Sequence, residues 1–268
     1  FFFFFLFSFL NRKNSVYQDK RRLLFKFSQM LVLILIAHML LTVFIDDTLD
    51  VVAIIENLAF LGGYLDISID TILIHYVNRE KITIIIDKLV MYFPHHELDR
   101  CNYNIKTNLQ ILKKHSFAFA FMSSGVIVVY SMMPVNVQMY GMVTENHQNL
   151  TSVFHLSFPF DQMQHGFYEV IYFYQVYATV FVLSLIIVND MLFCSLVELT
   201  AMELDIIADM ISEINMSKGA EAEKELKELI NIHQQLLEIV DTINEIFSIS
   251  MFMNTLGVTL VVCFTAFL

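Results

Sequence analysis

Residues 27–78 read FSQMLVLILIAHMLLTVFIDDTLDVVAIIENLAFLGGYLDISIDTILIHYVN and contain no Lys or Arg. Two strongly apolar runs lie on either side of the acidic turn Asp46-Asp47. A helix that crosses a bilayer needs about 20 residues, so this stretch is long enough to cross a membrane and return. It predicts two membrane helices, from about Leu24 to Phe44 and from about Val51 to Tyr76.

The positions of the basic residues predict the orientation of these helices. All sixteen Lys and Arg residues lie in 12–26, 79–114 and 218–227, and the second gap, 115–217, also holds two apolar runs. Because basic segments are retained on the cytoplasmic side of a membrane, the N-terminus is expected inside, with two crossings out and back. Cytoplasmic residues are then 1–23, 77–115 and 199–246, and 138–166 are extracellular.

The composition agrees with a membrane protein. The chain of 268 residues is 57% hydrophobic and only 16% charged, with a mean hydropathy of +0.62, whereas a soluble domain carries about 25% charged residues. No segment combines clustered basic residues with a soluble fold, so no nucleic-acid partner is expected. With seven glycines and no phosphate loop, nucleophile elbow or Cys–His arrangement, the chain offers no catalytic residues and no cofactor site.

Three further membrane helices are expected at about Phe117–Val137, Gly166–Val197 and Phe247–Leu268. The fourth helix continues as an amphipathic run, and a second amphipathic run leads directly into the fifth helix. The fold class is therefore all-α: a polytopic transmembrane helical bundle with five membrane helices and long cytoplasmic helix extensions. Its parts are a cytoplasmic segment 1–23, helices 1–4 with an outer ligand-pocket region over 24–198, a cytoplasmic helical assembly region over 199–246, and a truncated fifth helix over 247–268.

Several smaller features carry weaker signals. Asn149-Leu150-Thr151 is a glycosylation sequon in the predicted outside loop, whereas a second sequon at Asn215 falls on the cytoplasmic side. The adjacent histidines of His95-His96-Glu97 point apart, so a solvated loop is favoured over a metal site. The chain begins with Phe and ends inside an apolar run, so a partial chain is expected, and the role of Phe1–Leu10 stays open.

Two acidic residues of the second helix, Asp66 and Asp70, share one face because they are four residues apart. Ionisable groups inside a membrane are costly and usually face a protein interior or water. They either form an ion or polar-network site, or lie hydrated near the inner boundary of the bilayer. The hydrated interpretation is favoured, since a small shift of the helix would place both at the interface.

A series of motifs occurs in a recognisable order. Phe158-Pro159-Phe160 is followed by Tyr168–Tyr177 with Gln175, by Asn189-Asp190, and by Ile232–Leu237 before Ile246-Phe247-Ser248. This order, with an inside N-terminus, resembles the insect odorant receptor family, mainly from residue 155 onward. The resemblance implies a seven-helix plasma-membrane protein, the odorant-specific subunit of a ligand-gated cation channel that assembles with a shared co-receptor.

The resemblance leaves alternatives. The seventh helix, which lines the ion pore in that family, is absent from this chain, so pore function of the chain alone is in doubt. A gustatory receptor of the same superfamily or a non-functional receptor fragment remains possible. A transporter is less expected, because the helices show no repeated interruptions by Gly or Pro.

The outer halves of the second, third and fourth helices carry aromatic and Met side chains, which suit an apolar ligand. The resemblance implies an odorant site among these helices, in the outer part of the bundle. Membrane lipid would surround the bundle. Ordinary helix packing with a Tyr belt at the interface would also explain these residues. The predicted ligand-binding set is Phe60, Tyr64, Gly125, Val129, Met132, Tyr172 and Val176.

Overall fold

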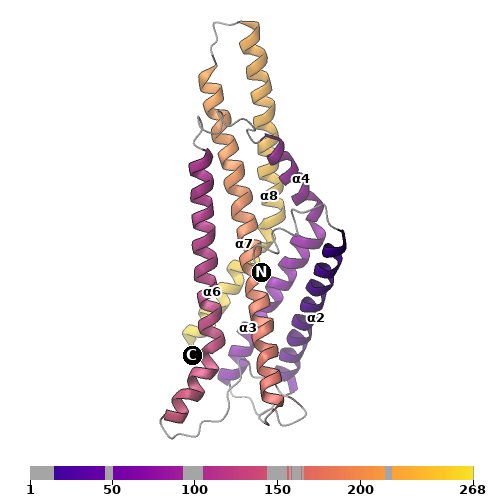
Figure 1. The fold of residues 1–268 in the computed structure, drawn as a ribbon, viewed down its shortest axis with the longest axis vertical. Helices are drawn as coiled ribbons and strands as arrows, with labels where there is room; N and C mark the ends of the chain where they lie inside the picture. The colour runs from indigo at the N-terminus through magenta and orange to yellow at the C-terminus, as the bar shows by residue number, and fades with distance from the viewer. Residues whose placement is uncertain are drawn as a thin grey trace. The chain divides into compact units, whose positions relative to one another are not determined.

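A computed structural model describes residues 15–45, 51–92, 105–143, 156, 158, 164, 166–214 and 219–267. All regular structure in these ranges is helical, which confirms the all-α class (Figure 1). The elements are α2 (Ser15–Ile45), α3 (Val51–Ile72), the π-helix η1 (Leu73–Val77), α4 (Arg79–Tyr92), α6 (Ile105–Val143), α7 (Phe167–Glu213) and α8 (Ala220–Phe267).

Three described helices are long and apolar enough to cross a membrane. They are Phe25–Ile45, Val51–Val77 and Phe167–Glu213, and the first two agree closely with the predicted spans. The 47 residues of α7 extend over about 70 Å at about 1.5 Å per residue, whereas the hydrocarbon core of a bilayer is about 30 Å thick. Only part of α7 fits inside a membrane, so the helix continues beyond it as the sequence predicts.

The long helices begin at glycines with left-handed backbone, which a residue with a Cβ rarely adopts. Gly166 has φ +95° and precedes α7, and Gly219 has φ +63° and precedes α8. The Glu169 carboxylate accepts a hydrogen bond of 2.5 Å from the Gly166 N–H, and negative charge at a helix N-terminus is favourable. From Gly219 onward α8 is continuous, which confirms that the second amphipathic run leads directly into the fifth predicted helix.

One predicted helix is longer than its apolar core. The third membrane helix is predicted at about Phe117–Val137, but α6 runs from Ile105 to Val143. Residues 105–116 are rich in Lys, Gln and Leu, which are good helix formers. Hydropathy detects only the apolar part of such a helix, so the prediction stopped short at both ends.

The described residues form two compact units. Unit 1 contains α2, α3 up to Asp70, residues 120–188 of α6 and α7, and the end of α8 from Met253. Unit 2 contains η1, α4, the start of α6, α7 from Asn189 to its end at Glu213, and α8 up to Phe252. Each unit has its own buried residues.

The core of unit 1 is formed by α2, α3 and α7. Its buried members are Val32, Leu35, Ile36, Met39, Leu61, Tyr64, Ile67, Leu156, Ala178, Phe181, Val182 and Leu185. Half-buried aromatic side chains pack against them, including Phe25, whose ring lies 6.0 Å from that of Phe181. Large apolar side chains also cover the outside of these helices, such as Phe44 and Phe173. Such an apolar exterior is expected of a surface that faces lipid.

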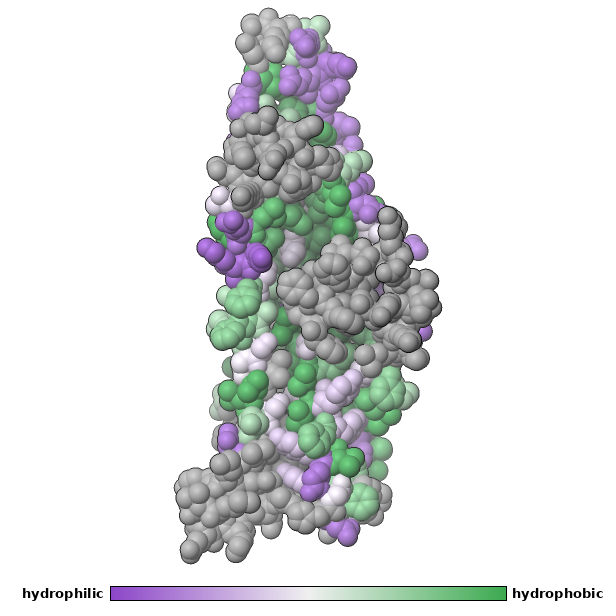
Figure 2. Space-filling view, viewed as in Figure 1, coloured by the Kyte–Doolittle hydropathy of each residue, from purple (hydrophilic) through white to green (hydrophobic). Residues whose placement is uncertain are grey.

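Unit 2 has an apolar interior and a charged exterior. Its buried side chains include Ile82, Ile85 and Leu89 of α4 and Leu229, Leu236, Ile239, Ile243 and Ile246 of α8. Helix α4 is amphipathic, because its buried Ile82, Ile85 and Leu89 recur at spacings of three and four. On the face shown in Figure 2, hydrophilic side chains gather over the end of α7 and the start of α8.

Several sequence features lie outside the described residues. They are Phe1–Leu10, His95-His96-Glu97, Cys101 and the sequon asparagines Asn149 and Asn215. Cys194 and Cys263 are described, and both are free and exposed.

Candidate functional site

Polar side chains inside unit 1 connect α7 to its two neighbours. The hydroxyl groups of Tyr177 and Ser28 form a hydrogen bond with an O···O distance of 2.7 Å. The Tyr174 hydroxyl donates a hydrogen bond to the Leu31 carbonyl at 2.9 Å. Both contacts join α7 to α2. Neutral hydrogen bonds of this kind are suited to a membrane interior, because they satisfy polar groups without burying a charge.

A second polar contact joins α7 to α3. The Thr179 hydroxyl donates to the Gln175 carbonyl at 2.8 Å and lies 3.0 Å from the Tyr64 hydroxyl. A threonine hydroxyl has a single proton, so Tyr64 is the donor in the second bond. Tyr64, Gln175 and Thr179 are all buried, which makes this chain of bonds the polar centre of the apolar core.

The segment before α7 also reaches this core. Leu156 is buried in it, and Phe158 packs against it. The Phe158 ring lies 4.4 Å from the ring of His38 on α2. Phe158 belongs to the Phe-Pro-Phe motif of the sequence, so this part of the motif covers the helices rather than lying in solvent.

The structure places two of the predicted ligand-binding residues in the interior of unit 1. Tyr64 is a buried core residue, and Phe60, one helical turn earlier on α3, is half-buried against the same core. Their aromatic rings are therefore part of the packing between α3 and its neighbours.

Tyr172 joins α7 to α6. Its hydroxyl donates to the Ser131 carbonyl at 2.7 Å, and its ring stacks on that of Tyr168 with centroids 6.1 Å apart. Val176, one turn further along α7, is half-buried. Tyr172 thus bridges α7 and α6 through its hydroxyl group, while its ring stacks on that of Tyr168.

The remaining predicted residues lie on one face of α6, because their spacings are four and three. Val129 is 72% exposed and Met132 is 50% exposed. A Cβ added at Gly125 would meet no atom within 4 Å. The seven predicted residues thus fall into two groups. Phe60, Tyr64, Tyr172 and Val176 lie on α3 and α7, whereas Gly125, Val129 and Met132 form an open face on α6.

Sequence reasoning missed the polar partners in unit 1. Ser28, Tyr174, Tyr177 and Thr179 make interhelical or network bonds, but none was in the predicted set. Their only signal was the presence of hydroxyl groups within apolar runs. Which helix each one faces depends on packing, which periodicity alone does not reveal.

Asp66 and Asp70 are both buried, so the hydrated interpretation of this pair is wrong. The reason is that the helix does not end near them: α3 and η1 remain helical to Val77. The Asp66 carboxylate lies 3.6 Å from the position that a Cβ would occupy at Gly257 of α8. The glycine therefore allows α8 to approach this carboxylate closely.

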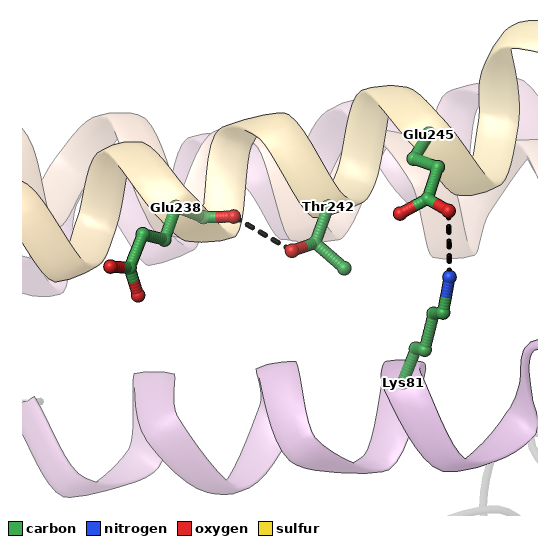
Figure 3. Close-up of polar contacts among 4 residues, drawn as sticks. All are labelled: Lys81, Glu238, Thr242 and Glu245. Carbon is green, nitrogen blue, oxygen red and sulfur yellow. Dashed lines mark hydrogen bonds and ion pairs between the residues drawn. The ribbon is translucent and has the colours of Figure 1, made fainter.

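In unit 2, α4 and α8 pack side by side with a polar rim (Figure 3). Lys81 pairs with Glu245 at 2.8 Å and Lys88 with Glu238 at 3.9 Å. The residue numbers rise on α4 as they fall on α8, so the two helices are antiparallel. Tyr92 continues the series through a hydrogen bond to Gln235.

The other contacts of unit 2 involve η1 and α7. The imidazole Nε2 of His75 lies 3.2 Å from the Asn189 amide oxygen, and both residues are buried. One turn further along α7, the Phe193 ring lies 5.1 Å from that of Phe247 on α8. Short π-helices are frequent at functional positions, and this one holds the turn from α3 into α4.

These features define a multi-pass helical membrane protein whose long helices continue beyond the bilayer. Within the described ranges, no three His, Cys, Asp or Glu side chains gather as metal ligands. The model of the 7tm odorant receptor family matches residues 50–268, and the chain belongs to that family. The match favours the odorant receptor family over the gustatory alternative.

Individual relatives agree with this family. Odorant receptor 85c of Drosophila melanogaster is 21% identical over 211 residues, which are 76% of this chain and 54% of the relative. The olfactory receptor OR5 of Machilis hrabei, solved in complex with eugenol, has a similar fold with a TM-score of 0.76. That match has 17% identity and covers 95% of this chain and 64% of the receptor chain. A second structure of the same receptor matches with a TM-score of 0.74, at 17% identity over 96% of this chain and 64% of that one. The chain thus spans between half and two thirds of these relatives.

Proposed function

We propose that this chain is the odorant-binding part of an odorant receptor subunit, which gates a cation channel together with the family's co-receptor. Family membership over residues 50–268 is the observation that carries this proposal. The ligands are small, volatile and mostly apolar, because the candidate site offers apolar and aromatic side chains and few polar groups. Their binding energy comes mainly from apolar burial, at about 25 cal/mol per Å².

The proposed location is the plasma membrane, with a cytoplasmic N-terminus. The alternation of basic and basic-free segments supports this orientation. Glycan addition tests it: in cells, Asn149 should be modified and Asn215 should not. Modification of Asn215 would reverse the orientation.

The proposed ligand position is beside Tyr172, between α6 and α7. Tyr172 contributes an aromatic face, and its hydrogen bond to Ser131 couples its position to α6. The predicted residues Val129 and Met132 lie on α6 on either side of Ser131 in the sequence, and Val176 follows on α7. A ligand that contacts this group would favour one arrangement of the two helices, as gating requires.

Substitutions of Tyr172 in a full-length receptor separate the contributions of ring and hydroxyl. Tyr172→Ala removes both and should raise the half-maximal odorant concentration roughly ten- to hundredfold, for about 1–3 kcal/mol of lost contact. Tyr172→Phe keeps the ring and should have a smaller effect. Phe44→Ala is the control, because Phe44 is an exposed aromatic residue of α2. Unchanged odorant responses of Tyr172→Ala and Val129→Ala, with normal surface expression, would place the pocket elsewhere.

Assembly with the co-receptor is proposed to use the cytoplasmic half of α8. Leu226, Ile230, His233, Leu237 and Val240 repeat at spacings of four and three, as in helices that pack on a second helix. Ile230, Leu237 and Val240 are exposed. The adjacent Leu229 and Leu236 are buried inside this chain, so they are unsuitable for testing assembly.

The corresponding experiment is co-purification of the two subunits. The double substitution of Ile230 and Leu237 by Asp should abolish recovery of the co-receptor, because it charges both apolar positions. Asn231→Asp, on an exposed position about 100° around the helix from Ile230, adds a charge as a control and should leave recovery intact. Retained association of the double variant would remove this surface from the proposal.

A further inference from the structure

The end of α7 carries a buried carboxyl group that no contact explains. Glu203 is only 3% exposed, and its Oε1 makes no hydrogen bond to any described residue. It lies on a helical face with Leu196, Thr200 and Ile207, which are equally buried. The Thr200 hydroxyl already bonds to the Leu196 carbonyl at 2.8 Å. Glu203 is therefore the ionisable member of a buried face whose other members, Leu196, Thr200 and Ile207, do not titrate.

This position lies beyond the membrane-spanning part of α7. Glu203 is 36 residues after the start of the helix at Phe167, which corresponds to about 54 Å at about 1.5 Å per residue. That length exceeds the roughly 30 Å of the hydrocarbon core. The carboxyl group is buried by protein packing in unit 2.

Glu203 forms no ion pair with any described residue. The contact between Phe193 and Phe247 shows that α7 packs on α8 in this unit. Lysines of α4 and α8 pair with other carboxylates: Lys81 with Glu245, Lys88 with Glu238, Lys224 with Glu228 and Lys227 with Glu223. Among the other ionisable groups of α7 and α8, Glu198, Asp205, Asp209, His233 and Asp241 are exposed. Burial alone raises the pKa of Glu203 from 4.5 to about 7.

We propose that Glu203 is a proton-dependent latch of unit 2: its carboxyl group is protonated while the end of α7 is packed, and loss of the proton loosens that packing. The geometry supports this, because a neutral carboxyl is tolerated in an apolar contact whereas an unpaired carboxylate is costly. The cytoplasmic helices would then respond to pH near neutrality.

The sign of the effect follows from the two pKa values. Below about pH 4.5 the residue is protonated in both the packed and the loosened state, so the stabilisation is complete. As pH rises toward the folded pKa of about 7, only the packed state holds the proton. The equilibrium then shifts toward the loosened state by up to about tenfold per pH unit. Above that pKa both states are ionised and the effect levels off.

Hydrogen exchange of the full chain in detergent micelles tests the latch. The amides of residues 199–213 are followed at pH 5.5, 6.5 and 7.5, after correction for the pH dependence of intrinsic exchange. In the wild-type chain the opening constant should rise severalfold per pH unit. In Glu203→Gln it should not change with pH, because the amide does not titrate.

Two further variants make the result decisive. Glu198→Gln removes an exposed carboxylate of the same helix and should keep the wild-type pH dependence. Glu203→Met fills the same space without a polar group, so its opening constant should also be independent of pH. This variant replaces Glu203→Gln in the test if Glu203→Gln folds poorly. A wild-type opening constant that does not change with pH, or a dependence that persists in Glu203→Met, would overturn the proposal.

Discussion

The two units of this chain have opposite distributions of polar groups. In unit 1, the hydroxyl groups of Tyr64 and Thr179 are buried and bonded, while large apolar side chains such as Phe173 are on the outside. In unit 2, Leu236 is fully buried and the ion pair of Lys81 and Glu245 is on the rim. The first pattern suits a lipid environment and the second suits water.

Helix α7 contributes to both units and therefore carries both distributions of polar groups. Its residues 170–188 carry no charged side chain, and acidic residues become frequent only after Asp190. Its buried polar contacts in unit 1 are neutral, whereas in unit 2 charges are mostly exposed. The change along one continuous helix indicates where the bilayer ends, and Glu203 is the exception that breaks the second pattern.

The largest expected effect contrasts two adjacent residues of unit 2. Leu236 is 0% exposed and Leu237 is 45% exposed. Leu236→Ala should destabilise unit 2 by about 2–5 kcal/mol, since it leaves a cavity in a packed interior. Leu237→Ala should change stability by less than about 0.5 kcal/mol. Thermal unfolding of the isolated chain in detergent, where no partner covers Leu237, measures both; equal losses would contradict the assigned helix faces.

A medium effect is expected in unit 1. Tyr64→Phe removes the hydrogen bond to Thr179 and should cost about 1 kcal/mol. The loss is limited because Thr179 still donates to the Gln175 carbonyl, so no buried donor is left unpaired. Thermal unfolding in detergent measures the difference from the wild-type chain. No measurable cost of Tyr64→Phe would exclude this bond as a stabilising contact.

The smallest effect is expected at the rim of unit 2. Lys88→Ala removes an exposed pair with a separation of 3.9 Å and should change stability by less than about 0.5 kcal/mol. Lys81→Ala removes a closer pair and should cost slightly more. Both differences should shrink as salt is raised. A loss comparable to that of Leu236→Ala would show that the charged rim, and not the apolar interior, holds α4 on α8.

Much of the fold could be predicted from the sequence because hydrophobic runs and basic residues report directly on the membrane. The apolar part of α2 follows from hydropathy, whereas its start at Ser15 was not predicted. The continuity of α7 and α8 and the amphipathic character of α4 follow from periodicity. The burial of Asp66 and Asp70 could not be predicted, since it depends on the approach of α8 at Gly257. For the same reason the sequence did not reveal that Leu236 is buried and Leu237 exposed. Nor did it reveal that Tyr64 is buried while Val129 lies on an open face.

We propose that unit 1 faces lipid and that unit 2 lies in the cytoplasm, and cysteine labelling tests this central proposal most directly. In a full-length background with Cys101, Cys194 and Cys263 replaced by Ser, single cysteines are placed at Leu33 of unit 1 and Ala201 of unit 2, both exposed in the structure. A membrane-impermeant maleimide should label Ala201→Cys only after the cells are permeabilised, and should not label Leu33→Cys in either condition. Labelling of Ala201→Cys in intact cells, or of Leu33→Cys in either condition, would contradict the account.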